Sequence, residues 1–274
     1  MTANLTPPTA SKTEAPTPSL PPTDLPYDDG EPLESNRHRI AMNVLIEAAY
    51  QAWGDRDDCF AGGNMFVYYS SRQARNVDFR GPDFFAVLGV EGRKAERKYW
   101  AIWDEEGRYP DVIVEFMSPS TAAVDLNEKK DLYAQTFHTR EYFVYDPFEP
   151  TSLQGWRLAN GNYATLSPDE RGWLWCDVLQ LWLGIWPGEI LHETAAWLRF
   201  FDREGNLVPL GNELAVTAQQ QAAVERQRAE AERQRAEAER QRAEAEQQRA
   251  EAATAELAAL QVKLRAQGID PEQL

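Results

Sequence analysis

A seven-residue repeat, ERQRAEA, limits what the C-terminal part of the chain can fold into. It occurs three times from Glu225 and is followed by one EQQRAEA unit that ends at Ala252. Glu and Arg recur three and four residues apart, a spacing at which opposite charges support a solvated α-helix. We therefore expect one long charged helix over residues 214–274 and a separate globular domain before it.

A period of seven is also the period of a coiled coil, in which two positions of each heptad carry the apolar contacts. Traced back from Leu257, Leu260 and Leu264, such a seam carries Ala at one core position and Glu at the other. These side chains pack poorly in a coiled coil. We predict a charged helix that self-associates weakly near its C-terminal end, with a dimeric coiled coil as the alternative. Either would make the protein a homo-oligomer.

The first 30 residues contain seven prolines among Thr, Ser and Ala. This composition buries little apolar surface, so we expect residues 1–30 to form a disordered leader. The leader lacks the basic segment and apolar core of a secretory signal. No apolar run approaches the roughly 20 residues of a membrane span. Two isolated cysteines indicate a reducing compartment, and together these features predict a cytoplasmic protein without a membrane partner.

The formal net charge is −16, and the repeat contributes little of it, with eight Glu against seven Arg in residues 225–252. The acidic excess therefore belongs mostly to the globular part and disfavours broad adhesion to nucleic acid. Binding of DNA would need a locally basic groove or a partner protein. The basic cluster in the segment EGRKAERKYW, which starts at Glu91, is expected to be a solvated hairpin tip, with contact to phosphates as the alternative.

Residues 31–213 carry the pattern of one mixed α/β domain. Ser35 can cap a helix whose apolar residues recur at helical spacing as far as about Trp53. Short β-branched or aromatic runs then predict strands, and Glu128 to about Phe137 predicts a second helix. The aromatic-rich segment 173–186 is expected to extend the sheet or to cover one face of it. The predicted strands are residues 65–69, 84–88, 112–116 and 142–145, with further short strands within 153–210.

The predicted strand at 112–116 places Glu115 within an otherwise apolar run. A buried, unpaired carboxylate costs several kcal/mol or shifts its pKa upward, so Glu115 needs a metal or another cation beside it. Asp83 opens the preceding predicted strand, and pairing of the two strands would bring both carboxylates to one end of the sheet. Two hard oxygen ligands from neighbouring strands suit Mg²⁺. The alternative is that Glu115 lies on the solvent side of an edge strand.

These residues resemble the Uma-two family of the PD-(D/E)xK nuclease superfamily. The resemblance covers roughly residues 25–213 and implies a restriction-endonuclease-like core, with a central mixed sheet flanked by helices. It further implies a site at which Mg²⁺ or Mn²⁺ supports phosphodiester hydrolysis in DNA. The matching residues are Pro82-Asp83, the run PDVIVEFMSPST from Pro110, Asp125, Glu128-Lys129, Tyr133 and the run EYFVYD from Glu141.

Asp83 and Glu115 match the family's two acidic metal ligands, and the resemblance implies the backbone carbonyl of Phe116 as a further ligand. The superfamily's lysine normally lies two residues beyond the second acid, where this chain has Met117. The resemblance implies that Lys129, from the following helix, replaces it as a catalytic residue. A surface ion pair with a neighbouring acid is the alternative for Lys129.

Three further residues are weaker candidates for the site. Lys130 adjoins Lys129 but points about 100° away around a helix. His38 lies at the start of the first predicted helix, where it could approach the site or simply pack. Glu47 follows His38 by nine residues, on the opposite side of that helix.

The sequence thus predicts a Mg²⁺-dependent endonuclease that acts on DNA. Met117 at the usual lysine position keeps one alternative open, because function resides in the site rather than in the fold. In that alternative the domain is a catalytically silent interaction protein that oligomerises or docks through its C-terminal helix.

Overall fold

The computed structural model describes residues 21–22, 25–27, 35–70, 72, 74, 80–94, 97–266 and 268. Most of the predicted leader at residues 1–30 lies outside the described residues. The chain forms two compact units, residues 1–210 and residues 211–274.

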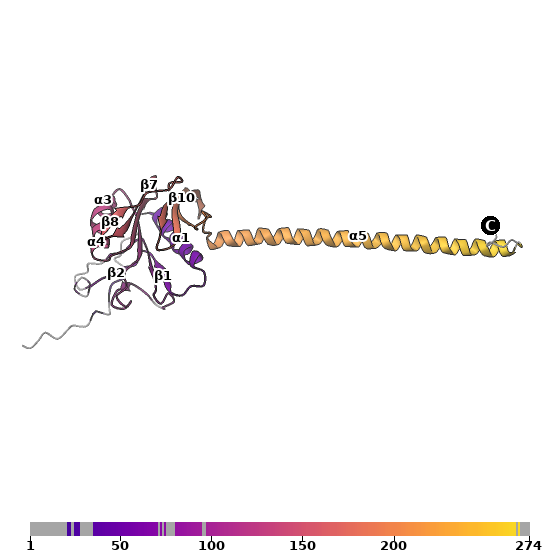
Figure 1. Ribbon diagram of the computed structural model, residues 1–274, viewed down its shortest axis with the longest axis horizontal. Helices are drawn as coiled ribbons and strands as arrows, with labels where there is room; N and C mark the ends of the chain where they lie inside the picture. Colours follow the sequence, from indigo (N-terminus) through magenta and orange to yellow (C-terminus); the bar gives the residue numbers. More distant parts are fainter. Residues whose placement is uncertain are drawn as a thin grey trace, which may run out of the picture. The chain divides into compact units, whose positions relative to one another are not determined.

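A six-stranded sheet forms the centre of the first unit, in the order β1-β3-β5-β6-β7-β8. Figure 1 labels β1, β7 and β8 of this sheet. β5 (Val112–Phe116) pairs antiparallel with β3 (Phe84–Leu88) and parallel with β6 (Glu141–Asp146), which makes the sheet mixed, as predicted. β5 is an interior strand, so the alternative that Glu115 lies on an edge strand is wrong. The outer strands pair antiparallel and are β1 (Cys59–Gly62), β7 (Glu149–Ala159) and β8 (Asn162–Thr165).

One face of this sheet is covered by α1 (Asn36–Trp53) and by a second, antiparallel sheet. The Ser35 hydroxyl caps α1 by accepting a hydrogen bond from the His38 amide. Buried residues of α1 pack with Val112 and Val114 of β5. The aromatic-rich segment 173–186 therefore covers a face and does not extend the central sheet. The second sheet consists of β9 (Leu174–Cys176), β10 (Leu181–Ile190) and β11 (Glu193–Phe201).

The opposite face packs against a broken helix and a small parallel sheet. The helix starts earlier than predicted, with α3 (Ala122–Val124), a π-helical turn η1 (Asp125–Lys129) and α4 (Lys130–Gln135). Tyr133 and Phe137 pack with Ile113 of β5. The predicted strand at 65–69 is only β2 (Val67–Tyr68), which pairs with β4 (Trp100–Ala101) outside the central sheet.

The expectation of a solvated basic hairpin tip is wrong for Arg97. Its side chain is 4% exposed and lies 3.0 Å from the Glu105 carboxylate. Its guanidinium stacks over Phe60 and Trp100, at 4.4 and 5.0 Å from the ring centroids. Lys94 also pairs with Glu105. Part of the positive charge of this segment is thus neutralised by Glu105 within the domain.

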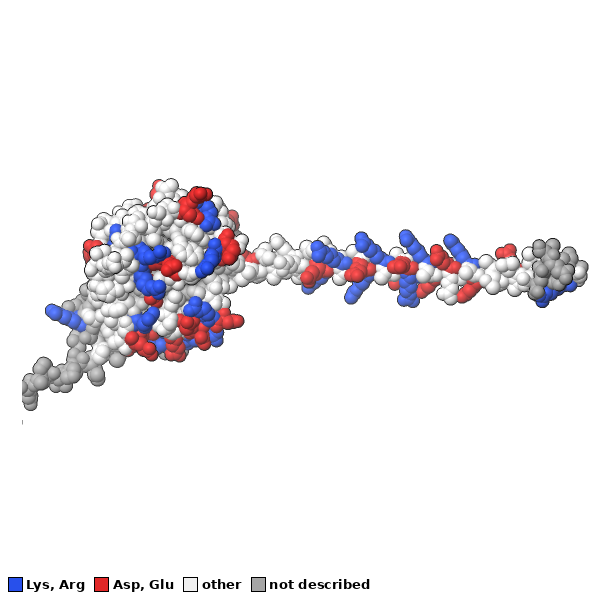
Figure 2. Space-filling model, in the orientation of Figure 1, with Lys and Arg blue, Asp and Glu red and all other residues white. Residues whose placement is uncertain are grey.

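The second unit contains the helix α5 (Gly211–Ala266), none of whose residues is buried. Charges of both signs follow one another along it (Figure 2), and Arg240 pairs with Glu244 at 2.9 Å. Such pairs favour a solvated helix. Self-association through α5 stays a prediction. Among the described residues, no helix combines the length and the apolar character needed to cross a membrane.

Candidate active site

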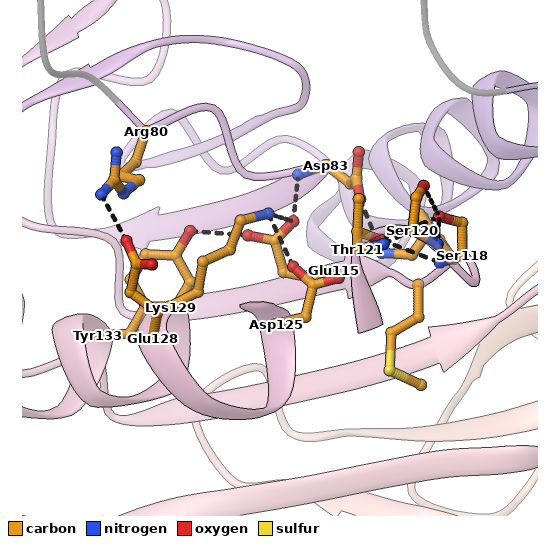
Figure 3. Close-up of polar contacts among 12 residues, drawn as sticks. Arg80, Asp83, Glu115, Ser118, Ser120, Thr121, Asp125, Glu128, Lys129 and Tyr133 are labelled. Carbon is orange, nitrogen blue, oxygen red and sulfur yellow. Dashed lines mark hydrogen bonds and ion pairs between the residues drawn. The ribbon is translucent and has the colours of Figure 1, made fainter. Parts of the chain in front are cut away.

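Two acidic residues lie side by side where β3 begins and β5 ends (Figure 3). Asp83 directly precedes β3, and Phe84 pairs with Val114, so the antiparallel register sets Asp83 opposite Glu115. The Asp83 amide donates to Glu115 Oε2 at 3.4 Å, and the Phe116 amide donates to Asp83 Oδ2 at 2.7 Å. Glu115 is 1% exposed. Each acid is therefore held by the backbone of the other's segment.

Lys129 reaches the same place from η1. Its Nζ lies 3.2 Å from Glu115 Oε2 and 2.9 Å from Asp125 Oδ1. The structure thus brings together Asp83, Glu115 and Lys129, which lie far apart in the sequence. Lys129 is largely enclosed, with 21% of its side chain exposed, so the alternative of a surface ion pair does not hold.

Asp125 and Tyr133 complete this cluster, although the sequence assigned them no role in the site. The Tyr133 hydroxyl donates to Glu115 Oε1 at 2.7 Å, and both residues are buried. Asp125 is 1% exposed. Their spacing is the signal that could have identified them, because Asp125, Lys129 and Tyr133 follow one another at intervals of four residues.

The π-helical turn explains how these three side chains come to point the same way. In an α-helix four residues turn the chain by about 400°, so residues four apart drift by about 40° at each step. The wider i→i+5 turn at Asp125–Lys129 rotates less per residue and offsets this drift. All three side chains therefore face the end of β5. Turns of this kind often occur at functional sites.

Lys130 and Glu47 are not brought into the cluster. The Lys130 ammonium lies 4.0 Å from the ring centroid of Trp156, where it makes a cation–π contact. Glu47 is on the exposed side of α1. Because α1 packs on the face of the sheet opposite to the one that Glu115 occupies, Glu47 points away from the acids.

His38 and Phe116 lie beside the cluster. His38 Nε2 is 3.3 Å from the carbonyl oxygen of Met117, and its Nδ1 is 2.8 Å from the Ser35 hydroxyl. His38 thus joins the start of α1 to the backbone just after β5. Phe116 contacts Asp83 through its amide, and metal binding by its carbonyl stays a prediction.

The cluster has fewer positive charges than negative ones. Burial, and next the neighbouring Glu115, raise the pKa of Asp83 well above its ordinary value. The same two causes raise the pKa of Asp125. Burial alone would lower the pKa of Lys129, but Glu115 and Asp125 outweigh burial and raise it, so the lysine stays charged. One ammonium faces three carboxylates, which leaves a deficit of two positive charges when all three acids are ionised.

A divalent cation fits this deficit. The available donors are carboxylate oxygens, which suit hard ions such as Mg²⁺ and Mn²⁺. Among the described residues, no group of three or more His, Cys, Asp and Glu side chains is preformed as a metal site. Two carboxylates are nevertheless enough for Mg²⁺, which keeps several waters and often takes its remaining ligands from substrate phosphates.

Without divalent ions, we expect the thermal stability of the protein to fall as the pH rises, and we expect Asp83→Asn to weaken this fall. The raised pKa means that folded Asp83 keeps a proton that the unfolded chain has already released. Its contribution to stability is complete below the ordinary aspartate pKa and is lost as the pH rises through the raised one. Melting temperatures recorded in EDTA between about pH 4 and pH 9 measure this loss of stability. Each kcal/mol lost should lower the melting temperature by about 2–4 °C.

The matched control for this measurement is Asp131→Asn, because Asp131 is exposed on α4. The control should keep the pH dependence of the wild type. Mg²⁺ should raise the melting temperature of the wild type most at high pH, where the acids are ionised. An identical pH dependence in the wild type and in Asp83→Asn would contradict the charge deficit.

Comparisons with known proteins give a family. The family model Uma2, described as "Putative restriction endonuclease", matches residues 18–185, which is more than half of the chain. A crystal structure described as that of "a putative nuclease belonging to DUF820" from Anabaena variabilis is similar at 12% sequence identity and a TM-score of 0.39. The similarity covers 56% of this chain and 81% of that one. No curated protein gives a significant match. The extent of the family match shows that this chain belongs to the Uma2 family of restriction-endonuclease-like proteins.

Proposed function

We propose that the protein is a Mg²⁺- or Mn²⁺-dependent endonuclease that hydrolyses phosphodiester bonds in DNA. The observation that carries this proposal is the cluster of Asp83, Glu115 and Lys129, which combines two acids from paired strands with one ammonium. Membership of the Uma2 family supports a nuclease function.

In this proposal Asp83 and Glu115 hold the divalent ion. When bound, such an ion polarises a phosphate oxygen and lowers the pKa of a bound water. Lys129 orients the attacking hydroxide or stabilises the negative charge that develops on the phosphate. Asp125 keeps Lys129 charged and directs its ammonium, and Tyr133 fixes the orientation of Glu115.

The position of Met117 is compatible with activity. Its side chain is 5% exposed and packs in the core that contains Ile113 and Tyr133. The ammonium that other superfamily members place there comes here from Lys129, at 3.2 Å from Glu115. This contact favours an active enzyme over the catalytically silent alternative.

Purified wild-type protein should convert supercoiled plasmid DNA to nicked or linear forms in Mg²⁺ or Mn²⁺, and EDTA should stop the reaction. Single-stranded DNA and RNA, tested in parallel, would define the substrate. Nicking that persists in EDTA would indicate a contaminant or another mechanism. Absence of cleavage on all three substrates, in either metal ion and with a folded protein, would refute the proposed activity.

A further inference from the structure

A pocket of about 310 Å³ opens beside Lys129. Glu128 and Lys129 line it from η1, and Arg80 and Gly81 line it from the segment that leads to Asp83. The lining also includes Asn64, Phe66 and Val124. The pocket therefore adjoins the carboxylate cluster and gives a ligand access to the ammonium of the proposed active site.

Two chain segments border the pocket, and each carries a charged residue at the pocket close in sequence to a residue of the cluster. Arg80 precedes Asp83 by three residues, and Glu128 directly precedes Lys129. The Arg80 guanidinium lies 3.1 Å from Glu128 Oε1, so an ion pair bridges the two segments (Figure 3). The backbone of Arg80 is fixed, because its carbonyl accepts a hydrogen bond from the Val67 amide at 2.6 Å.

We propose that Arg80 binds a phosphate of the nucleic acid next to the bond that is cleaved. In the absence of substrate, Arg80 forms an ion pair with Glu128, which the phosphate replaces. This inference rests on the proposed function and adds a substrate-binding residue to it. A guanidinium binds carboxylates and phosphates with the same planar pair of N–H groups. The Glu128 carboxylate therefore stands where a phosphate group can bind.

The exposure of the two partners allows this exchange. Glu128 is 67% exposed, whereas Arg80 is 27% exposed. Exposed ion pairs contribute little to stability, so a phosphate can displace Glu128 at low cost. Lys129 differs from Arg80, because the buried carboxylates of Glu115 and Asp125 neutralise its charge. In a chain with a net charge of −16, one exchangeable arginine at the pocket has a large influence on substrate binding.

The test compares Arg80→Gln with Glu128→Gln. Fluorescence anisotropy measures the affinity of each variant for a short labelled oligonucleotide, single-stranded or duplex, in Ca²⁺ and at several salt concentrations. Arg80→Gln should weaken binding about tenfold and reduce the salt slope by about one. Glu128→Gln should strengthen binding about threefold to tenfold, because it removes a carboxylate that competes with the phosphate for Arg80 and repels it. Asp131→Asn, which removes the charge of an exposed acid on α4, is the matched control and should change the affinity much less than Glu128→Gln.

The opposite changes in affinity expected for the two variants distinguish substrate binding by Arg80 from a purely structural role of the ion pair. If the ion pair only held the two segments together, both variants would weaken binding, and the inference would be wrong. It would equally be wrong if the affinity stayed unchanged in both variants, or if the wild type bound no oligonucleotide even at low salt. The binding assay does not depend on hydrolysis. Opposite shifts in a protein that cleaves nothing would refute only the proposed activity, and cleavage with unchanged affinities would refute only the role of Arg80.

Discussion

Glu115→Gln should slow metal-dependent cleavage at least about a thousandfold while the protein stays folded. The change removes one anionic metal ligand but keeps the shape of the side chain. The amide oxygen of Gln can still accept the hydrogen bond from Tyr133. Metal ions contribute several kcal/mol to transition-state stabilisation, and a loss of about 4 kcal/mol corresponds to a thousandfold lower rate. Initial rates of plasmid nicking at saturating Mg²⁺ measure the effect.

Glu47→Gln is the matched control, since it makes the same chemical change on the exposed side of α1. It should cleave at the wild-type rate. Thermal unfolding in EDTA should show that Glu115→Gln stays folded, because Lys129 keeps its contact with Asp125 and because the loss of the Glu115 charge removes one cause of the raised pKa of Asp83. A folded Glu115→Gln protein that retains a tenth or more of the wild-type rate would exclude Glu115 as an essential ligand.

The central features of this site could be predicted because they depend on local patterns. Val112, Val114 and Phe116 alternate with Ile113 and Glu115, so a strand at this position sets Glu115 on one defined face. A Pro-Asp pair directly before the preceding apolar run, residues 84–88, indicated the position of Asp83. The antiparallel register of β3 and β5 then brings the two acids together.

The rest of the site depends on tertiary contacts that the sequence does not encode locally. The π-helical turn sets the register of Asp125 and Tyr133, and a plain helical pattern over 128–137 does not reveal such a turn. Gly63 is a second example. A Cβ atom there would lie 2.3 Å from the Asp83 carbonyl oxygen and 2.6 Å from Met42 Cγ. The close packing that requires this glycine becomes visible only when β1, α1 and Asp83 have been assembled.

Arg97 shows that the charge of a segment does not by itself predict the exposure of its side chains. The segment around it is basic and bounded by strands, which is typical of a solvated turn. Its partner Glu105 and the ring of Phe60 come from other segments, and the ring of Trp100 lies at the end of the same segment. The long aliphatic part of an arginine packs well against rings when a carboxylate neutralises its head group. The sequence therefore overestimates the basic surface that is available to nucleic acid.

Lys129→Met should lower both the cleavage rate and the stability, and Mg²⁺ should restore only the stability. Methionine keeps the length of the side chain but leaves the buried acids Glu115 and Asp125 without an ammonium. Removal of one partner from a buried ion pair costs about 3 kcal/mol or more, and protonation of an acid limits the loss. A divalent ion bound by the acids replaces the missing charge and should bring the melting temperature back towards that of the wild type.

Cleavage should stay about a hundredfold or more below the wild type even at saturating Mg²⁺, because the group that stabilises charge on the phosphate is still missing. Lys130→Met is the matched control. It removes the neighbouring ammonium, which lies over Trp156, and should reduce stability by about 1 kcal/mol at most while cleavage continues. Parallel melting curves and nicking rates in EDTA and in Mg²⁺ distinguish the stabilising role of Lys129 from its role in cleavage. If the cleavage rate of Lys129→Met recovered together with its melting temperature, Lys129 would only support the fold of the site and would not act on the substrate.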